Sequence, residues 1–262
     1  MLRPRIIPCL LIKDGGLVKT VRFDNPKYLG DPINAVKIFN EKQVDELIIL
    51  DIDATVKNQE PDMEMISNLA SECRMPICYG GGIKNVKQIR QIIALGVEKI
   101  SISSAAIQNP DLVSEASEYV GNQSIVLTLD VKKVNDEYQV FTHNGSKMTG
   151  LDLIEIIRKY QNLGVGEIVI NSISHDGIMN GYDFVLIDYI KDRVNVPLTI
   201  LGGAGSHDDI GMLISKYGLI GASAGSLFVF KGVYKAVLIN YPNLIEKEKI
   251  MCRYYKTQVT QK

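Results

Sequence analysis

The sequence of 262 residues contains little that would point to a metal, a membrane or a nucleic acid. Its four cysteines are scattered without a Cys-x-x-Cys pair, which is typical of a reduced, cytoplasmic protein without bound metal. The three histidines lie far apart, so neither a zinc site nor another cofactor is expected. A net charge of −1 leaves no excess of positive charge that would attract nucleic acid. No apolar run is long enough to cross a bilayer and no signal-peptide pattern is present, so we expect a protein that is neither exported nor in a membrane.

The chain instead alternates short apolar segments with helical segments, and its hydrophobic fraction of 46% is ample for a large core. The segments that favour strands are 5–12, 47–51, 77–79, 99–103, 124–132, 167–171, 198–201 and 219–222. Those that favour helices are 34–42, 63–71, 86–95, 110–119, 151–163, 184–191, 208–215 and 234–240. This alternation predicts one (β/α)8 TIM barrel over residues 1–262. A doubly wound open sheet is the alternative, although it usually has fewer strands.

Four local features add detail to this pattern. Residues 13–32 form a connection longer than a βα turn needs, and long connections are often functional. The Asn-Asp pair within residues 133–141 suggests a small inserted hairpin. Asn109 is expected to cap the helix that begins at residue 110. Residues from Glu246 onward are polar and are expected to form a tail or a peripheral turn.

The two halves of the chain resemble each other. The segment 44–50 is similar to 165–171, Gly80-Gly81-Gly82 is similar to Gly202-Gly203-Ala204, and Ser103-Ser104 is similar to Gly225-Ser226. All three pairs are separated by about 120 residues. A duplicated half-barrel would leave this pattern, and it predicts a ligand site with approximate two-fold symmetry.

Small residues end four of the predicted strands. Glycine lets backbone N–H groups approach an anion, and a serine hydroxyl completes a phosphate site. The same glycines could simply form tight βα turns. Because the two sets are related by the repeat, we expect a ligand with a phosphate at each end, bound by Gly81, Gly82, Ser103, Ser104, Gly202, Gly203, Gly225 and Ser226.

Asp130 ends the central apolar segment 124–132, at the end of a parallel strand where ligand sites lie. It is a candidate general acid or base, or it could cap a loop or pair with Lys132. The repeat places Leu11 at the equivalent position of the first half. The mouth of the barrel therefore has one such carboxylate, unless Asp14 or Asp51 substitutes.

Charged residues at two other places allow further hypotheses. Asp176 follows the sixth strand and could bind a polar ligand or form an Asp-Gly turn. Beside it, His175 could titrate near neutral pH. At the opposite end of the barrel, the strand starts carry two bases and two acids, which could close a salt-bridged ring or remain ordinary solvated charges. These four residues are Arg5, Glu46, Lys99 and Glu167.

These residues resemble the cyclase subunit of imidazole glycerol phosphate synthase over nearly the whole chain. The matching motifs are numerous and in order. They include Arg5-Ile6-Ile7, Lys13-Asp14-Gly15, Gly30-Asp31-Pro32, Asp45-Glu46-Leu47, Gly80-Gly81-Gly82-Ile83, Thr128-Leu129-Asp130, Gly166-Glu167-Ile168, Asp176-Gly177, Gly181-Tyr182-Asp183 and Gly202-Gly203-Ala204-Gly205.

The resemblance implies a barrel that forms a heterodimer with a glutaminase subunit docked at its bottom. Ammonia released from glutamine would pass a charged gate and rise along the barrel axis. At the top it would react with a bis-phosphorylated ribulosyl-formimino intermediate to give imidazole glycerol phosphate and an aminoimidazole carboxamide ribotide. The gate of the family corresponds to the ring of Arg5, Glu46, Lys99 and Glu167.

Two departures separate this chain from that pattern. The family uses two aspartates, and Leu11 replaces the first; losing a general acid or base lowers a rate by a factor of about 10² to 10⁴. Ser103 and Ser104 replace an asparagine and a threonine. The pattern resembles a diverged branch that acts with an ATP-dependent N-acetyl sugar amidotransferase in making surface polysaccharides. We therefore expect an ammonia-conducting barrel, with a working cyclase and a plain phosphosugar-binding barrel as alternatives.

Overall fold

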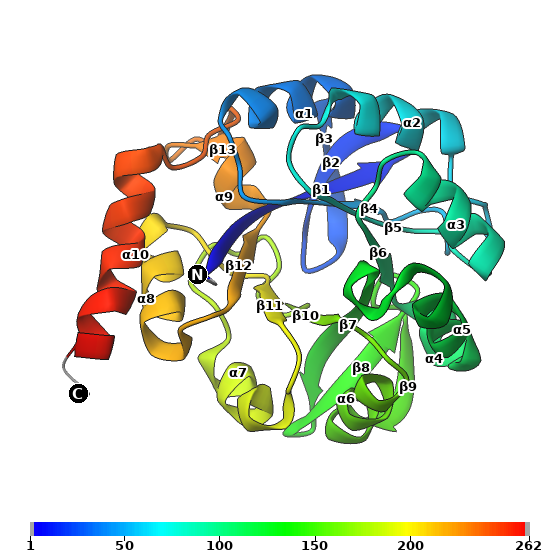
Figure 1. Cartoon of the computed structure of the whole chain (residues 1–262). Coiled ribbons are helices and arrows are strands. Elements are labelled where there is room, and N and C mark those ends of the chain that lie inside the picture. The colour runs from blue at the N-terminus through cyan, green and yellow to red at the C-terminus, as the bar shows by residue number, and fades with distance from the viewer. Residues whose placement is uncertain (1–2, 260–262) are drawn as a thin grey trace.

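Eight parallel strands close into a barrel in the computed structural model, which describes residues 3–259 (Figure 1). Each strand pairs with its neighbour, and pairing between β7 and β10 closes the ring. This confirms the (β/α)8 prediction and excludes the open sheet. Around the barrel the strands are β1 (Arg5–Lys13), β4 (Leu47–Asp51), β5 (Ile77–Gly80), β6 (Lys99–Ile102), β7 (Ile125–Val134), β10 (Glu167–Ser172), β11 (Leu198–Leu201) and β12 (Gly221–Ala224).

Helices cover the outside of the barrel, and several of them begin at a side-chain cap. The side chains of Asp31, Asp62, Asn85, Asp152 and Ser206 each accept a backbone hydrogen bond from the first turn that follows. The helices are α1 (Pro32–Glu41), α2 (Met63–Glu72), α3 (Val86–Ala94), α4 (Ser104–Gln108), α5 (Asp111–Val120), α6 (Leu153–Asn162), α7 (Phe184–Ile190), α8 (His207–Tyr217), α9 (Ser226–Val229) and α10 (Leu244–Val259). None of the helices in residues 3–259 is both long and apolar enough to span a bilayer.

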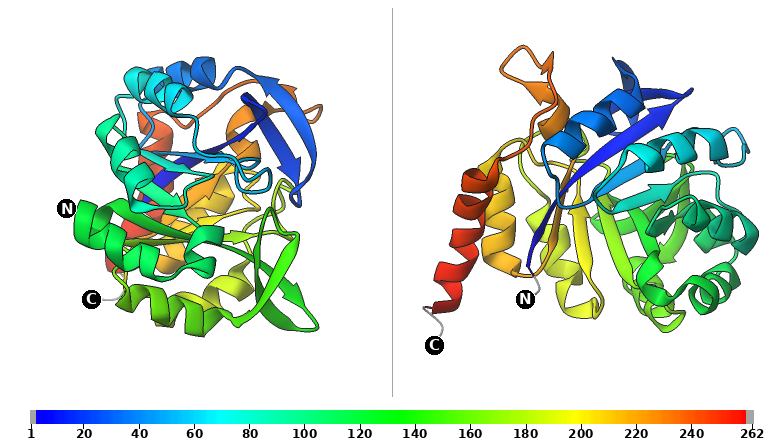
Figure 2. Two further views of the ribbon diagram at one scale, coloured as in Figure 1. Left: turned by 90° about the vertical axis from the view of Figure 1, so that its right-hand side faces the viewer. Right: turned by 45° about the horizontal axis from the view of Figure 1, so that its top comes forward.

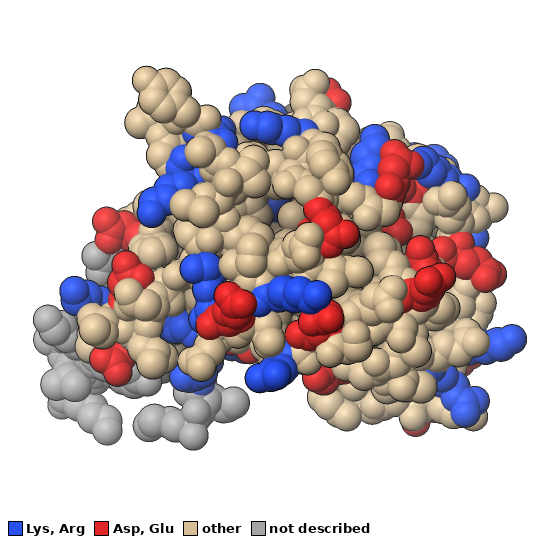
Figure 3. Space-filling model, turned by 90° about the horizontal axis from the view of Figure 1, so that it is seen from above, with Lys and Arg blue, Asp and Glu red and all other residues tan. Residues whose placement is uncertain are grey.

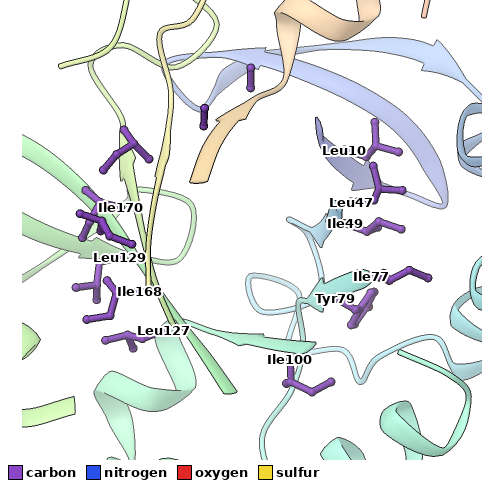
Figure 4. Close-up of a cluster of buried hydrophobic side chains, with 14 of the residues drawn as sticks. Leu10, Leu47, Ile49, Ile77, Tyr79, Ile100, Leu127, Leu129, Ile168 and Ile170 are labelled. Carbon is purple, nitrogen blue, oxygen red and sulfur yellow. The ribbon is translucent and has the colours of Figure 1, made fainter. Parts of the chain in front are cut away.

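Alternate residues of the strands form two apolar layers. Outward-facing residues such as Leu10, Ile49, Leu129 and Ile170 pack under the helices (Figure 4). The residues between them face the barrel axis and form a second cluster. This axial cluster consists of Ile7, Cys9, Ile48, Cys78, Val126, Val169 and Leu201, with Leu11 and Leu50 packed against it.

Three antiparallel hairpins extend the barrel at the carboxyl end of its strands, opposite the two termini (Figure 2). The long connection 13–32 forms the first, from β2 (Gly16–Val21) and β3 (Asp24–Gly30). The predicted hairpin at 133–141 is confirmed, because β7 continues into β8 (Glu137–Thr142), and β9 (Lys147–Asp152) adds a further strand. A third hairpin joins β13 (Phe230–Lys231) to β14 (Ala236–Val237).

Three local predictions at helices were wrong. Residues 234–240 are not a helix, because they form β14 and the turn before it, with Val233 and Tyr234 left in solvent. The expected tail after Glu246 is instead α10, which lies beside α8 (Figure 1) and buries Ile250. Asn109 does not cap α5, which begins without a side-chain cap, because Asn109 ends α4.

Candidate functional site

One cavity opens at the carboxyl ends of the barrel strands, and it brings together the residues predicted for the top of the barrel. Parallel strands of a closed barrel all end at one rim, so side chains distant in sequence meet there. The predicted residues that line it are Gly81, Gly82, Ser103, Ser104, Asp130, Asp176, Gly202, Gly203, Gly225 and Ser226.

Asp130 is held in the cavity wall by its neighbour on β10. The amide Nδ2 of Asn171 donates a hydrogen bond of 3.0 Å to a carboxylate oxygen of Asp130. Burial raises the pKa of Asp130 to about 7, the Asn171 bond opposes the rise, and the charge of Asp176 adds to it. Lys132 points to solvent, so the alternative pairing with that lysine is wrong. Asp130 is therefore suited to exchange a proton near neutral pH.

Asp176 lies in a turn and lines the cavity, and binding of a polar ligand by it stays a prediction. Its carboxylate accepts hydrogen bonds from the Thr20 hydroxyl at 2.8 Å and from the Phe23 backbone at 3.2 Å. It thereby anchors the β2–β3 hairpin beside the cavity that it lines. Burial raises its pKa, and the Thr20 hydrogen bond limits the rise. Beside it, the Nδ1 of His175 lies 2.9 Å from the Ser172 hydroxyl.

The glycines at the strand ends are required by close backbone contacts. Gly81 has φ +123°, and a Cβ there would lie 2.3 Å from the carbonyl oxygen of Asp51. Gly203 has φ +110°, and a Cβ would lie 2.1 Å from the carbonyl oxygen of Gly181. Only glycine fits these positions without strain. Backbone packing alone therefore accounts for glycine at both positions, and phosphate binding at the two repeat-related ends stays a prediction.

The serines differ between the two ends of the cavity. Ser104 begins α4, and its hydroxyl accepts a hydrogen bond from the His143 backbone at 3.2 Å. Ser226 begins α9 and is buried beside the opposite glycines. Both serines line the cavity.

The first half of the barrel has an apolar pair where the second half has a polar one. Asp130 lies opposite Asn171 in the β7–β10 pairing, whereas Leu11 lies opposite Leu50 in the β1–β4 pairing. Of the two substitutes for a carboxylate at position 11, Asp51 lines the cavity, with its pKa raised by burial.

Asp14 does not substitute for the missing carboxylate. Its side chain is 67% exposed and forms an ion pair with Lys57. It is not among the residues that line the cavity. Asp51 is therefore the one of the two candidates that the fold brings to the mouth.

Lys19 is a site residue that the sequence analysis missed. It lies on β2, is 5% exposed, and its Nζ donates to the carbonyl oxygen of Cys9 at 2.5 Å. A Cβ on Gly225 would lie 2.3 Å from this Nζ, so the cation lies against the second glycine-serine end. Burial lowers its pKa. The available signal was the β-branched residues Val18, Thr20 and Val21, which favour a strand in a segment that was taken as a connection.

The four charged residues at the opposite end close a ring. Arg5 pairs with Glu46 and with Glu167 at 2.7 Å, and Lys99 pairs with the same two carboxylates at 2.8 Å each. Burial acts to raise the pKa of Glu167, but hydrogen bonds from Arg5 and Lys99 outweigh it and hold the pKa below its usual value. These are not separate solvated charges. The axial apolar cluster lies between this ring and the cavity.

Comparison with known proteins gives a consistent family. Residues 5–235 match the family model described as histidine biosynthesis protein. The chain is 56% identical over 253 residues to the Vibrio vulnificus protein named "Putative imidazole glycerol phosphate synthase subunit hisF3", covering 96% of this chain and 97% of the relative.

Two further relatives agree with this match. The Leptospira interrogans protein named "Putative imidazole glycerol phosphate synthase subunit HisF" is 52% identical, over 95% of this chain and 99% of its own length. The imidazole glycerol phosphate synthase subunit HisF of Natranaerobius thermophilus is 39% identical, over 92% and 96% respectively. The chain therefore belongs to the histidine biosynthesis protein family, in which it is a cyclase-subunit (HisF) type member.

Proposed function

We propose that this chain is the ammonia-using subunit of a glutamine amidotransferase, and that a glutaminase docks at the ring end of the barrel. The observation that carries the proposal is the order of features along one axis. A closed ring of four charges is followed by an apolar cluster, and that cluster leads to a cavity with two glycine-serine ends.

The axis favours neutral ammonia over ammonium. An unpaired cation is strongly disfavoured among apolar side chains, whereas a small neutral molecule loses much less on leaving water. Ammonium arriving at the ring would also meet Arg5 and Lys99, which already pair with both carboxylates. Ammonia can therefore enter only when side chains of the ring shift aside, and it then reaches the cavity uncharged.

The cavity accommodates a ligand with a phosphate at each end. One phosphate would bind at Gly81 and Gly82 with Ser103 and Ser104, and the other at Gly202 and Gly203 with Gly225 and Ser226, near Lys19. The centre of such a ligand would lie at Asp130. Backbone N–H groups, hydroxyls and one lysine are the donors that phosphate groups prefer.

The first candidate reaction is closure of the imidazole ring on a bis-phosphorylated ribulosyl-formimino compound, in histidine biosynthesis. The names of the relatives favour this role over the polysaccharide role expected from Leu11. Asp130 would exchange the proton, because its pKa of about 7 lets it act in either direction. Asp51 is the second carboxylate available in the cavity.

The second candidate is delivery of ammonia to a separate ATP-dependent N-acetyl sugar amidotransferase. Leu11 favours it, because leucine cannot transfer a proton and its neighbour Leu50 is apolar as well. In that case the barrel would conduct ammonia and stimulate the glutaminase without closing a ring.

A cyclase assay separates the two candidates. The purified chain and its Leu11→Asp variant are given saturating ammonium and the ribulosyl-formimino bis-phosphate, and imidazole glycerol phosphate is measured. Turnover by the unmodified chain supports the first role. If Leu11→Asp forms the product at least about 10²-fold faster than the unmodified chain, which itself shows almost no turnover, ammonia delivery is the function of the unmodified chain. If a matched Leu50→Asp variant gains as much, the effect is not specific to position 11.

A further inference from the structure

We propose that His143 is the positively charged contact for a phosphate group at one end of the cavity, and that its contribution to binding grows as pH falls. We call this end, which is formed by Gly81, Gly82, Ser103 and Ser104, the first end. The inference rests on the phosphate-binding cavity of the proposed function. It adds a residue to that cavity to which neither the glycines nor the internal repeat points.

The residues around the cavity offer little positive charge. Among the described residues that line it, Lys19 and His143 are the only two whose side chains can carry a positive charge. Lys19 lies against Gly225, at the second end. A phosphate group carries about −1.5 to −2 charges at pH 7, and charged donors bind it more strongly than neutral ones. A ligand with two phosphates would therefore meet Lys19 at the second end and His143 at the first.

His143 is held beside the first end by hydrogen bonds of the turn between β8 and β9. Its backbone N–H donates to the Ser104 hydroxyl at 3.2 Å. The side-chain Nδ2 of Asn144 donates to the carbonyl oxygen of Ile52 at 2.5 Å. The carbonyl oxygen of His143 accepts from the Ser146 hydroxyl at 2.6 Å. These contacts tie the turn to α4 and to the connection after β4, so the imidazole is carried on a fixed part of the cavity wall.

The backbone of this turn is held in an unusual conformation. His143 has φ +53°, Asn144 has φ +55° and Gly145 has φ +71°, so three successive residues are left-handed. Gly145 packs on the ring of Phe23 from the β2–β3 hairpin, where a Cβ would lie 3.1 Å from a ring carbon. Such a conformation persists only where its surroundings fix it. The histidine is therefore in place before a ligand arrives, and little ordering of the chain is needed on binding.

The imidazole keeps one nitrogen free for a ligand. Its Nδ1 lies 3.1 Å from the Thr142 hydroxyl, and that hydroxyl donates a long hydrogen bond of 3.5 Å to the carbonyl oxygen of Lys147. A hydroxyl that donates to Lys147 accepts from the Nδ1–H of the histidine. This assigns the proton of the neutral ring to Nδ1, and Nε2 has no hydrogen-bond partner within residues 3–259. Protonation of Nε2 would create a donor and a positive charge together, as a phosphate oxygen requires.

The surroundings of the ring disfavour its charged form until an anion is bound. Burial lowers the pKa of His143, and the positive charge of Lys147 lowers it further. A phosphate beside Nε2 would raise this pKa, so binding near neutral pH would take up a proton. Further charged groups belong to β7, to the connection after β4 and to the β2–β3 hairpin, and they are Asp130, Asp51, Asp53, Lys57, Arg22 and Asp24.

The outer surface does not replace this charge. In Figure 3, Lys and Arg are interspersed with Asp and Glu over the face that is drawn, and the net charge of the chain is −1. Mixed charges of this kind give no field of one sign that would draw an anion to the cavity. Attraction of a phosphate to the first end therefore depends on the groups that line it, and His143 is the one among them that can become positive.

The test uses the full chain with inorganic phosphate as the probe, and it needs neither a glutaminase nor turnover. Nuclear magnetic resonance of the imidazole rings measures the pKa of His143 with and without phosphate. A His143→Asn variant identifies its signal, and asparagine tolerates the left-handed backbone. His207 does not line the cavity and is the internal control. Calorimetry then gives the affinity for the ribulosyl-formimino bis-phosphate at about pH 6 and about pH 8.5, below and above the ordinary pKa of histidine. The chains compared are the unmodified one, His143→Asn, His143→Lys and the matched control His207→Asn.

We expect phosphate to raise the pKa of His143 by about one unit or more and to leave His207 unchanged. His143→Asn should weaken binding of the bis-phosphate by about 10-fold at the lower pH, the value of one charged hydrogen bond, and by less than about 2-fold at the higher pH, where the ring is neutral. His143→Lys should bind tightly at both. Comparing variants at the same pH cancels the titration of the phosphate and of the cavity carboxylates.

Two results would overturn the inference. One is a pKa of His143 that phosphate does not move. The other is a loss in His143→Asn that is equal at both pH values and is not restored by lysine, because a merely structural role gives that result. If phosphate raises the pKa but the bis-phosphate does not bind, the ligand of the proposed function is refuted and the contact with His143 stands. Failure to stimulate a glutaminase would refute the proposed function without affecting this measurement.

Discussion

Replacing Asp130 with asparagine should make the stability of this protein less dependent on pH. Asn171 donates a 3.0 Å hydrogen bond to the carboxylate, and burial raises the pKa to about 7 from an ordinary value of 3.8. The asparagine has the shape of the protonated acid but cannot ionise. The variant therefore removes the unfavourable charge at high pH and changes little at low pH.

The sign follows from proton linkage. Because the pKa is raised on folding, the folded protein keeps a proton on Asp130 at pH values at which the unfolded chain has lost it. The stabilisation that this proton gives is complete below the pKa of the unfolded chain, and it is lost as pH rises through about 7. At about 1.4 kcal/mol per pKa unit, this group should lower the free energy of unfolding by about 3 kcal/mol between about pH 5 and about pH 8.5. Asp130→Asn should gain that amount relative to the unmodified chain over the same range.

Urea unfolding followed by far-ultraviolet circular dichroism at several pH values measures this difference. The matched control is Asp136→Asn, which removes a carboxylate whose side chain is 97% exposed in the turn before β8. Comparing each variant with the unmodified chain cancels the contributions of other titrating groups that do not contact the site. A stability difference for Asp130→Asn that stays constant with pH would refute the assignment of a buried, proton-exchanging carboxyl to this position.

Three other changes have outcomes that the structure predicts. Glu167→Ala leaves Arg5 and Lys99 short of a partner, and since both are partly exposed we expect a loss of about 2 kcal/mol in urea unfolding; an unchanged midpoint would mean that the ring contributes nothing to stability. Gly203→Ala should cost about 1 to 3 kcal/mol, because the new Cβ meets a carbonyl oxygen at 2.1 Å. The control is Gly150→Ala, which shares the strain of a positive φ (+70°) but has open space around the new Cβ and should cost less. Lys19→Met should weaken calorimetric binding of the bis-phosphate by roughly 10-fold or more, the value of one charged hydrogen bond, without lowering stability; undiminished affinity would exclude this lysine from the phosphate site.

The barrel and the set of residues around its mouth could be predicted because both follow from repeating local patterns. Buried parallel strands have continuous apolar segments, and their ends carry Gly81, Ser104 and Asp130, which the closed topology brings together. The ring was harder to predict. Spacing placed Glu46 and Glu167 at strand starts, but only three-dimensional closure shows both carboxylates within reach of the same two cations.

The errors lie where local patterns are weak. Lys19 was missed because the hairpin that carries it is held by contacts distant in sequence, such as the Thr20–Asp176 hydrogen bond. The final helix was placed too early because residues 234–240 contain good apolar spacing, and the real helix α10 begins only after the Asn243 cap. Its apolar face, including Ile250, is defined by packing against α8 rather than by a strong sequence pattern.

The two halves of the barrel carry the same type of residue at the bottom and different types at the top. At the bottom, Glu46 and Glu167 occupy equivalent positions and both serve the ring. At the top, Asp130 has its equivalent in Leu11, and this leucine packs with Leu50 against the axial apolar cluster. The apolar lining of the axis therefore extends to the cavity on one side.

This asymmetry affects the protonation state in which ammonia reaches the cavity. A carboxylic acid with a pKa near neutral at the end of the axis would convert ammonia to ammonium, which is not a nucleophile. An aspartate at position 11 would add a further carboxyl group there. With Leu11 in place, ammonia that leaves the axis meets no acid on β1, and the proton-exchanging groups that line the cavity are Asp130 and Asp51. The substitution thus lowers the capacity for acid–base catalysis and at the same time protects the nucleophile. Glutamine-driven and ammonium-driven turnover of Leu11→Asp, compared at the same pH, would show which of these two effects dominates.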